Sequence, residues 1–238
     1  MKKIILIALL FTNQLSHGQI NINDISNVIN STLGNNLTND QITKGLKEAL
    51  NVGTKNATKA VGKTDGYYKN NLIKIPFPSE AKDMKNTLVS LGLKKQVDAF
   101  EKQLNRAAED AAKKAAPIFL NAITKMTIND GLVILKGKDD EATQYLKRQT
   151  TADLKKEFKP IIAASLSKVQ ITKYWKPLSS SYNQVPFVKK VNPDLEDYVN
   201  QMAIDGLFKM VALEEAKIRK DPAARVNDIL QTVFGGKK

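Results

Sequence analysis

Signals for the start of an α-helix are the feature that most constrains how this chain folds. Five short stretches pair a capping side chain either with an acid or amide three residues later or with a proline in the next position. In the first kind, the two side chains satisfy each other's backbone amides. In the second, proline takes the first helical position, where no amide hydrogen is needed. The stretches are Thr38 with Gln41, Thr127 with Asp130, Thr150 with Asp153, Asn192-Pro193 and Asp221-Pro222.

Between these starts, apolar residues recur every three or four positions, which is the period of a helix with one buried face. No stretch alternates apolar and polar residues for long enough to predict a sheet. We therefore predict an all-α fold, a single multi-helix bundle of about ten helices. The predicted helices are 23–33, 39–61, 80–91, 94–115, 117–126, 128–136, 140–149, 152–168, 193–220 and 222–234. Pro160 is expected to kink or split the helix at 152–168.

Two stretches do not fit a helix. Residues 72–78, "LIKIPFP", contain two prolines, which favour an extended path. Residues 174–193 mix serine, proline and aromatic residues and predict a long loop over the surface of the bundle.

The first 18 residues, "MKKIILIALLFTNQLSHG", have the layout of a secretory signal peptide. Two lysines precede an apolar run at 4–11, and small residues follow at Ser16 and Gly18. We predict an exported protein, periplasmic or secreted, with one all-α domain at 19–238 whose first part, 19–37, packs loosely. No other segment reaches the length of a membrane helix, so the chain is not predicted to span a membrane.

Two absences limit the chemistry open to the protein. The chain has no cysteine, and its only histidine, His17, lies in the predicted signal peptide. A Ser-His-Asp or Cys-His site and an ordinary zinc site are therefore excluded. We predict no metal and no cofactor, which leaves the chemistry of carboxylates, Lys, Tyr, Ser and Thr.

The chain carries a formal net charge of +13, and much of its positive charge comes as lysine pairs spread along the sequence. Acids are interleaved with these pairs and few aromatic residues lie beside them, so they do not predict a nucleic-acid surface. An anionic component of the cell envelope, or another envelope protein, is the expected partner.

Two glycine-containing stretches resemble ligand loops but fit a helical reading better. "ATKAVGKT", 57–64, has part of a phosphate-loop pattern, yet it closes a predicted helix instead of opening one, so Gly62 is predicted to end that helix. "TINDGLVILKGKDDEAT", 127–143, matches neither a phosphate loop nor a calcium loop in its spacing. We predict that Gly137 ends one helix and that Asp139 or Asp140 caps the next.

The helix predicted at 193–220 carries an acid of interest. Its apolar stripe is predicted to be Leu195, Val199, Met202, Gly206, Met210 and Leu213. Asp205 borders this stripe, so we expect it to be partly buried and paired with a lysine or arginine. Glu214 and Glu215 are followed by basic residues and are predicted to lie at a solvated end of the helix.

Several motifs in collinear order resemble one bacterial family. They are "IPFP" at 75–78, "NRAAE" at 105–109, "MTINDGLVILKGKDDEATQYL" at 126–146, "FKPI" at 158–161, "LEDYVNQMAIDGLFKMVALEEAKIRKDP" at 195–222 and "VFG" at 233–235. Together they resemble the family catalogued as domain of unknown function 4197, whose members are exported helical proteins without an established activity. The resemblance implies recurring positions, of which five are candidate binding residues: Asp130, Asp140, Tyr145, Tyr198 and Asp205.

Three functions are compatible with these observations. The leading hypothesis is a non-catalytic envelope binding or scaffold protein. One alternative is a hydrolase that acts on an envelope glycan with carboxylates alone, which requires two acids among Asp130, Asp140, Asp197 and Asp205 to face each other across a cleft at about 5–10 Å. The other is a carrier with a cavity for an apolar ligand between its helices.

Overall fold

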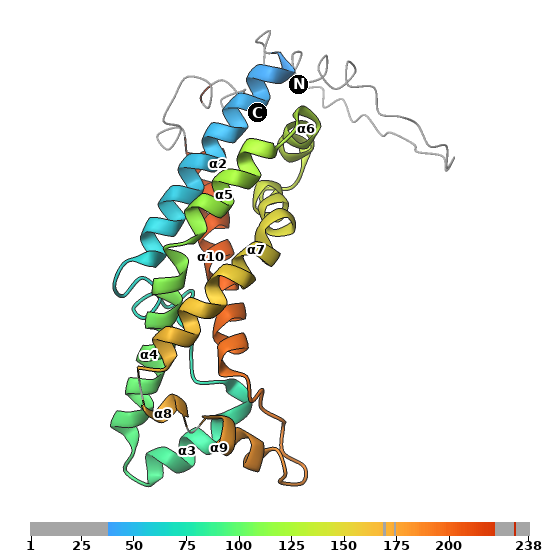
Figure 1. Cartoon of the computed structure of the whole chain (residues 1–238). Helices are drawn as coiled ribbons and strands as arrows, with labels where there is room; N and C mark the ends of the chain where they lie inside the picture. Colours follow the sequence, from blue (N-terminus) through green and yellow to red (C-terminus); the bar gives the residue numbers. More distant parts are fainter. Residues whose placement is uncertain (1–37, 169, 174, 222–230, 232–238) are drawn as a thin grey trace, which may run out of the picture.

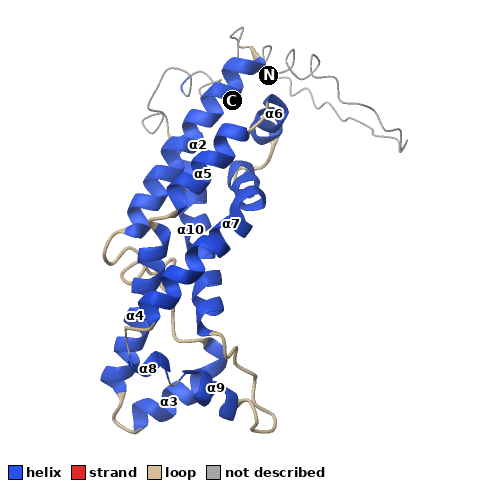
Figure 2. Cartoon of the chain, in the orientation of Figure 1, coloured by secondary structure: helices blue, strands red, loops and turns tan. Residues whose placement is uncertain are grey.

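The computed structural model describes residues 38–168, 170–173, 175–221 and 231, and within these ranges it contains helices and no strand (Figure 2). The all-α prediction is confirmed. The elements are α2 (Asn39–Gly62), the 3-10 helix η1 (Ser79–Ala81), α3 (Lys82–Ser90), α4 (Lys94–Ala112), α5 (Ala115–Lys125), α6 (Ile128–Lys136), α7 (Glu141–Leu166), α8 (Gln170–Lys173), α9 (Trp175–Tyr182) and α10 (Leu195–Lys220). The predicted signal peptide, the segment 19–37 and the helices predicted at 23–33 and 222–234 lie outside the described residues.

The helices form an elongated bundle (Figure 1). α6 lies at one end beside the start of α2, which we call the α6 end, and α3, α8 and α9 lie at the other, the α9 end. α7 and α10 connect the two. A contiguous cluster of buried apolar side chains runs through the bundle, and its largest fully buried members include Tyr67, Phe100, Phe119 and Phe158.

Helix α7 corrects two predictions. It runs unbroken from Glu141 to Leu166, so the helices predicted at 140–149 and 152–168 are one element, Pro160 does not split it, and the predicted count of about ten is not matched. Thr150 does not cap a helix, because its hydroxyl donates to the carbonyl of Leu146 at 2.7 Å inside α7. Near the proline, Asn200 Nδ2 of α10 donates to the carbonyl of Lys155 at 2.9 Å, a tertiary bond that supports the helix there.

The loop predicted at 174–193 contains a helix, α9. Its first residue, Trp175, is buried, and the indole stacks on Phe100 with ring centroids 5.6 Å apart and meets Phe77 edge-on at 5.7 Å. The serines and Pro177 hid this helix from sequence reasoning. Its position depends on aromatic contacts with distant residues, not on local propensity.

The segment that follows α2 is held by side chains of α4. Residues 74–78 form neither helix nor strand. Asn105 takes the place of a partner strand, since its Oδ1 accepts the amide of Ile75 and its Nδ2 donates to the carbonyl of Ile75, both at 2.8 Å. Glu109, which is 3% exposed, accepts the amides of Tyr67 and Tyr68 at 3.1 Å each.

Arg106 completes this arrangement. It donates to Glu109 Oε2 and to Asp65 Oδ1, both at 2.5 Å, and these bonds raise the pKa of the guanidinium. We call Asn105, Arg106 and Glu109 the clamp. The three polar residues of the "NRAAE" motif are thus the clamp residues, and each of them binds the segment between Asp65 and Ile75.

Close packing between this segment and α10 requires a glycine. The Tyr67 hydroxyl donates to the carbonyl of Ala203 at 2.6 Å, which brings its ring against α10. A Cβ at Gly206 would lie 2.7 Å from Cε1 of Tyr67 and 3.2 Å from Cβ of Ile73, so any larger residue there would push the segment away.

In the described ranges, no helix alone has the length and apolar character of a membrane span, whereas α5 and α6, bent by 104° at their junction, meet that criterion only when taken together.

Candidate functional site

The stretch 127–143 forms the corner between α6 and α7. Thr127 caps α6 as predicted, since Asp130 donates its amide to the Thr127 hydroxyl at 3.1 Å and Asp130 Oδ2 accepts the Thr127 amide at 2.9 Å. Gly137 follows the last residue of α6. Asp140 occupies the N-cap position of α7 but makes no capping bond, because its Oδ2 accepts from the Gln144 side chain at 2.9 Å instead.

The cap of α7 comes from α10. Glu215 accepts the amides of Ala142 at 3.1 Å and Thr143 at 2.8 Å, and also the Thr143 hydroxyl at 2.7 Å. Glu215 is buried, so the predicted solvated position was wrong. Its partner Arg219 binds Oε1 and donates to the carbonyl of Ile134 in α6 at 3.2 Å, and the pair thus ties the end of α6 to the start of α7.

A polar groove lies beside this corner, between α5, α6 and α7. Its volume is about 200 Å³, which is smaller than the ~300–1,000 Å³ of pockets for drug-sized molecules. The residues that line it are Ile118, Asn121, Ala122, Lys125, Asp130, Tyr145, Gln149, Thr150 and Asp153. Two of the five predicted candidates, Asp130 and Tyr145, therefore share one site, which we call the groove.

Five polar side chains of the groove have no protein partner among the described residues; Asn121, Lys125, Gln149 and Asp153 are exposed at its rim, and Tyr145 is buried. Within the part of the chain that the structure describes, no hydrogen bond or ion pair engages the side chains of Asn121, Lys125, Tyr145, Gln149 and Asp153. Tyr145 is the clearest case, because it is only 6% exposed and its hydroxyl still has no partner there. Burial, and then the charge of Asp130, raise the pKa of this phenol, so it remains a neutral donor.

Sequence reasoning missed four of these residues although a signal was present. Tyr145, Gln149 and Asp153 lie four residues apart on α7, and Asn121 and Lys125 have the same spacing on α5. Residues four apart share one face of a helix, so each helix presents a polar row. Asp153 had instead been interpreted as part of a capping box with Thr150.

Tyr198 lies apart from the groove and has a structural role. Its hydroxyl donates to the carbonyl of Pro76 at 3.1 Å, which helps to fix the extended segment. Burial, and then the charges of Glu80 and Glu101, raise the pKa of Tyr198 to about 12.

Asp205 is exposed on α10 and accepts from the Gln201 side chain at 3.0 Å, so its expected burial was wrong. The buried face of α10 includes Ala203, Ile204 and Leu207, whereas Leu213 of the predicted stripe is 40% exposed. Leu195, Val199 and Gly206 of the stripe are buried as predicted, and α10 buries a wider surface than the stripe because α2, α4 and α7 all pack against it.

The geometry gives little support to the two alternative functions, the glycan hydrolase and the carrier of an apolar ligand. Of the four acids named for a hydrolase, only Asp130 lines the groove, where it also serves as a helix cap. For an apolar-ligand carrier, the cavity between α2, α7 and α10 has a volume of only about 30 Å³. A larger hollow of about 520 Å³, between the end of α7 and the starts of α9 and α10, is lined by lysines and acids as well as by Leu166 and Trp175. Among the described residues, no group of three or more acids or histidines is placed to hold a metal ion.

A family model described as "Protein of unknown function (DUF4197)" matches residues 36–235. The chain belongs to this family. The match includes the clamp, the corner at 127–143 and the whole groove. No curated protein and no solved structure matches the DUF4197 chain.

Proposed function

We propose that this DUF4197 protein is an exported, non-catalytic binding protein of the cell envelope. In this proposal the groove recognises a small group that carries hydroxyls or amides, such as one sugar residue of an envelope glycan. The observation that supports it most is Tyr145, whose side chain is largely buried but whose hydroxyl is accessible from the groove and has no protein partner among the described residues. A phenol hydroxyl at the wall of a groove that no protein group engages can donate a hydrogen bond to a ligand and accept one from it.

The mixture of side chains favours a hydroxyl-bearing ligand over an anion. A hydroxyl can donate to the carboxylates of Asp130 and Asp153 and accept from the Lys125 ammonium or the two amides. An anion would meet two carboxylates for one ammonium and be repelled. The small volume fits one unit of a longer polymer better than a whole large ligand.

Titration of the purified full chain with soluble disaccharide fragments of peptidoglycan tests this proposal. Tyr145→Phe removes one hydroxyl and should weaken binding roughly three- to tenfold. Tyr198→Phe is the matched control, because it removes a hydroxyl outside the groove and should leave affinity unchanged. Absence of saturable binding, or an equal loss in both variants, would contradict the proposal.

The hydrolase alternative is supported by one observation, that Asp130 and Asp153 line the same groove. The same fragments decide it. Slow cleavage that disappears in Asp153→Asn would favour the hydrolase, whereas binding without cleavage favours the binding protein.

A further inference from the structure

The loop between α9 and α10 presents apolar side chains at the α9 end of the bundle. Phe187 is 108% exposed relative to a fully accessible residue, and Val185 is 51% exposed. The backbone of Phe187 has φ +66°, a region that bulky residues rarely adopt. Folding alone does not account for a phenylalanine held outside the core in this conformation.

The base of this loop is fixed by tertiary contacts. Asn183 closes residues 183–191 into a finger, since its Nδ2 donates to the carbonyl of Val191 at 2.8 Å and its Oδ1 accepts the Val191 amide at 2.7 Å. Val191 is buried, and the Trp175 indole donates to the neighbouring carbonyl of Asn192 at 3.1 Å. The apolar tip is therefore presented by an ordered base.

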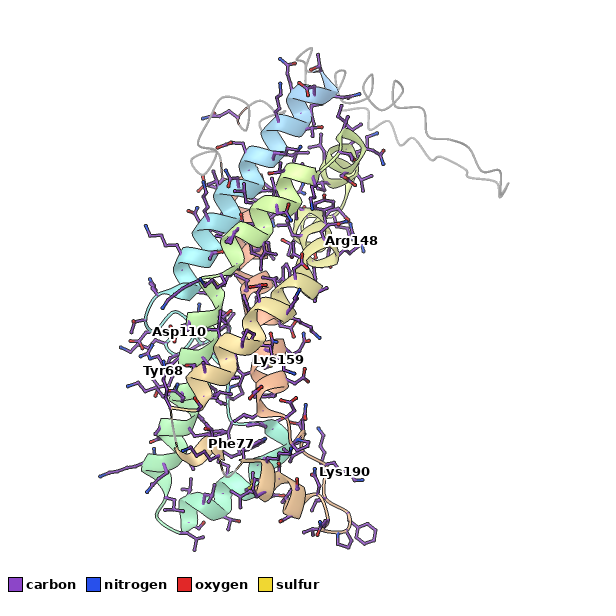
Figure 3. The ribbon with its side chains drawn as sticks, viewed as in Figure 1. Tyr68, Phe77, Asp110, Arg148, Lys159 and Lys190 are labelled. Carbon is purple, nitrogen blue, oxygen red and sulfur yellow. The ribbon has the colours of Figure 1, made fainter. Side chains whose placement is uncertain are left out.

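Lysines outnumber acids within the finger and beside it. Residues 173–193 contain four lysines and no acid, although Asp194 and Glu196 at the start of α10 line the same hollow as Lys173 and Lys176. Of these, Lys189 lies 3.5 Å from Glu80, whereas Lys176 and Lys190 form no ion pair with described residues. Lys190 lies at the α9 end, far from Arg148 in the first half of α7 (Figure 3).

A second segment places further exposed apolar and basic residues at the α9 end. The turn between α3 and α4 lies there (Figure 1) and exposes Leu91 by 69%. Lys94, which pairs with Asp98 one turn further along α4, and Lys95 begin the next helix. Two segments far apart in sequence thus combine exposed apolar residues with lysines at one end.

We propose that the α9 end docks on an anionic membrane surface, with Phe187 and Val185 inserted at the headgroup boundary and the surrounding lysines bound to lipid phosphates. Stable peripheral binding needs two such weak signals together, apolar insertion and electrostatic attraction. Lysine is depleted in protein–protein interfaces, so a lysine-ringed protruding tip fits lipid better than protein. Docking this way points the α6 end, and the groove, away from the membrane.

The absence of cysteine from the chain permits a direct test. Phe187→Cys, carrying an environment-sensitive fluorophore, should show a blue-shifted emission with vesicles of phosphatidylcholine and phosphatidylglycerol, and quenching by spin-labelled lipid. The same label at Leu120→Cys, an exposed leucine of α5, should not respond. The full chain is used throughout, so any contribution of the first 18 residues is common to all variants.

Vesicle co-sedimentation measures each contribution. Phe187→Ser should lower partitioning roughly tenfold, and Lys176→Glu with Lys190→Glu should lower it roughly tenfold or more. Lys155→Glu with Lys156→Glu is the charge-matched control on α7 and should have a smaller effect. An unshifted label at residue 187, or equal binding by all variants, would overturn the proposal. A label that shifts with envelope proteins and not with lipid would overturn it in favour of a protein partner.

Discussion

The clamp and the groove use the same kinds of side chain in opposite ways. In the clamp, Asn105, Arg106 and Glu109 bind one another or the chain between Asp65 and Ile75. In the groove, two amides, a lysine, a phenol and an acid make no such bonds within the described residues. A buried polar side chain that is bonded within the protein stabilises the fold, whereas one that faces an open groove without a protein partner is available to a ligand. The two regions should therefore respond in opposite ways to substitution.

The largest effect is expected at Glu109. Glu109→Gln replaces the buried carboxylate that Arg106 binds with a neutral amide, while Arg106, which is 25% exposed, keeps its pair with Asp65. The free energy of unfolding should therefore fall by about 1.5–3 kcal/mol, as for the loss of a hydrogen bond to a charged group. Urea denaturation measures the loss. Asp110→Asn, next in sequence, removes only an exposed pair with Lys113 and should cost about 0–1 kcal/mol. Similar losses in the two variants would mean that the clamp is not the stabilising feature.

Gly206→Ala tests the packing that the clamp maintains. The added methyl group would approach the Tyr67 ring, so we expect a loss of about 1–3 kcal/mol from overpacking. Gly53→Ala is the matched control, because its Cβ would meet only ordinary contacts at 3.6 Å in the middle of α2. That change should stabilise the protein by about 0.5–1 kcal/mol. Chemical denaturation of both variants gives the comparison, and the same sign of effect in both would contradict it.

Removal of one hydroxyl compares the two regions most directly. Tyr67→Phe loses the bond to Ala203 and should lower the free energy of unfolding by about 1 kcal/mol. Tyr145→Phe loses no bond within the described residues, so stability should be unchanged or slightly raised while ligand binding falls. A stability loss in Tyr145→Phe as large as that in Tyr67→Phe would show that the groove tyrosine is structural.

The smallest effect is a pH dependence at the edge of the clamp. Lys69, and then Arg106, hold the pKa of Asp65 below its usual value of 3.8. A depressed folded-state pKa contributes stability above the unfolded-state value, and this contribution is lost as pH falls below about 4. The difference in unfolding midpoint between the wild-type chain and Asp65→Asn should therefore be present at pH 7 and shrink in acid.

The control is Asp153→Asn, in the groove, which should change stability little because it removes no bond. A difference that stays constant from pH 7 to pH 2 would contradict this assignment.

Local signals predicted much of the helical structure. The boxes at Thr38 and Thr127 were predicted and are formed, since a capping box involves residues only three apart. Thr150 has the same spacing and forms none, because a threonine inside a helix can bond to the preceding turn instead. A short motif therefore makes a helix cap possible, and the packing around it decides whether the cap forms.

Only two residues of the groove were predicted. Asp130 and Tyr145 were named from the family resemblance, but their closeness depends on the sharp turn between α6 and α7. Glu215 and Arg219 hold that corner from α10, more than seventy residues away in sequence. An i, i+4 pair of Glu and Arg has the same spacing whether it is buried or solvated, so sequence could not distinguish the two.

By itself, the sequence determined that the chain is helical, that α2 and α6 start at their threonines, and that cysteine chemistry is absent from it. These properties follow from composition and from contacts between residues a few positions apart. Only the tertiary structure decided that Glu215 caps α7, that Asp205 is exposed, that Trp175 begins a helix and that a polar row on α5 faces one on α7. Each of these depends on which helix faces meet, and that is set by the packing of the whole core.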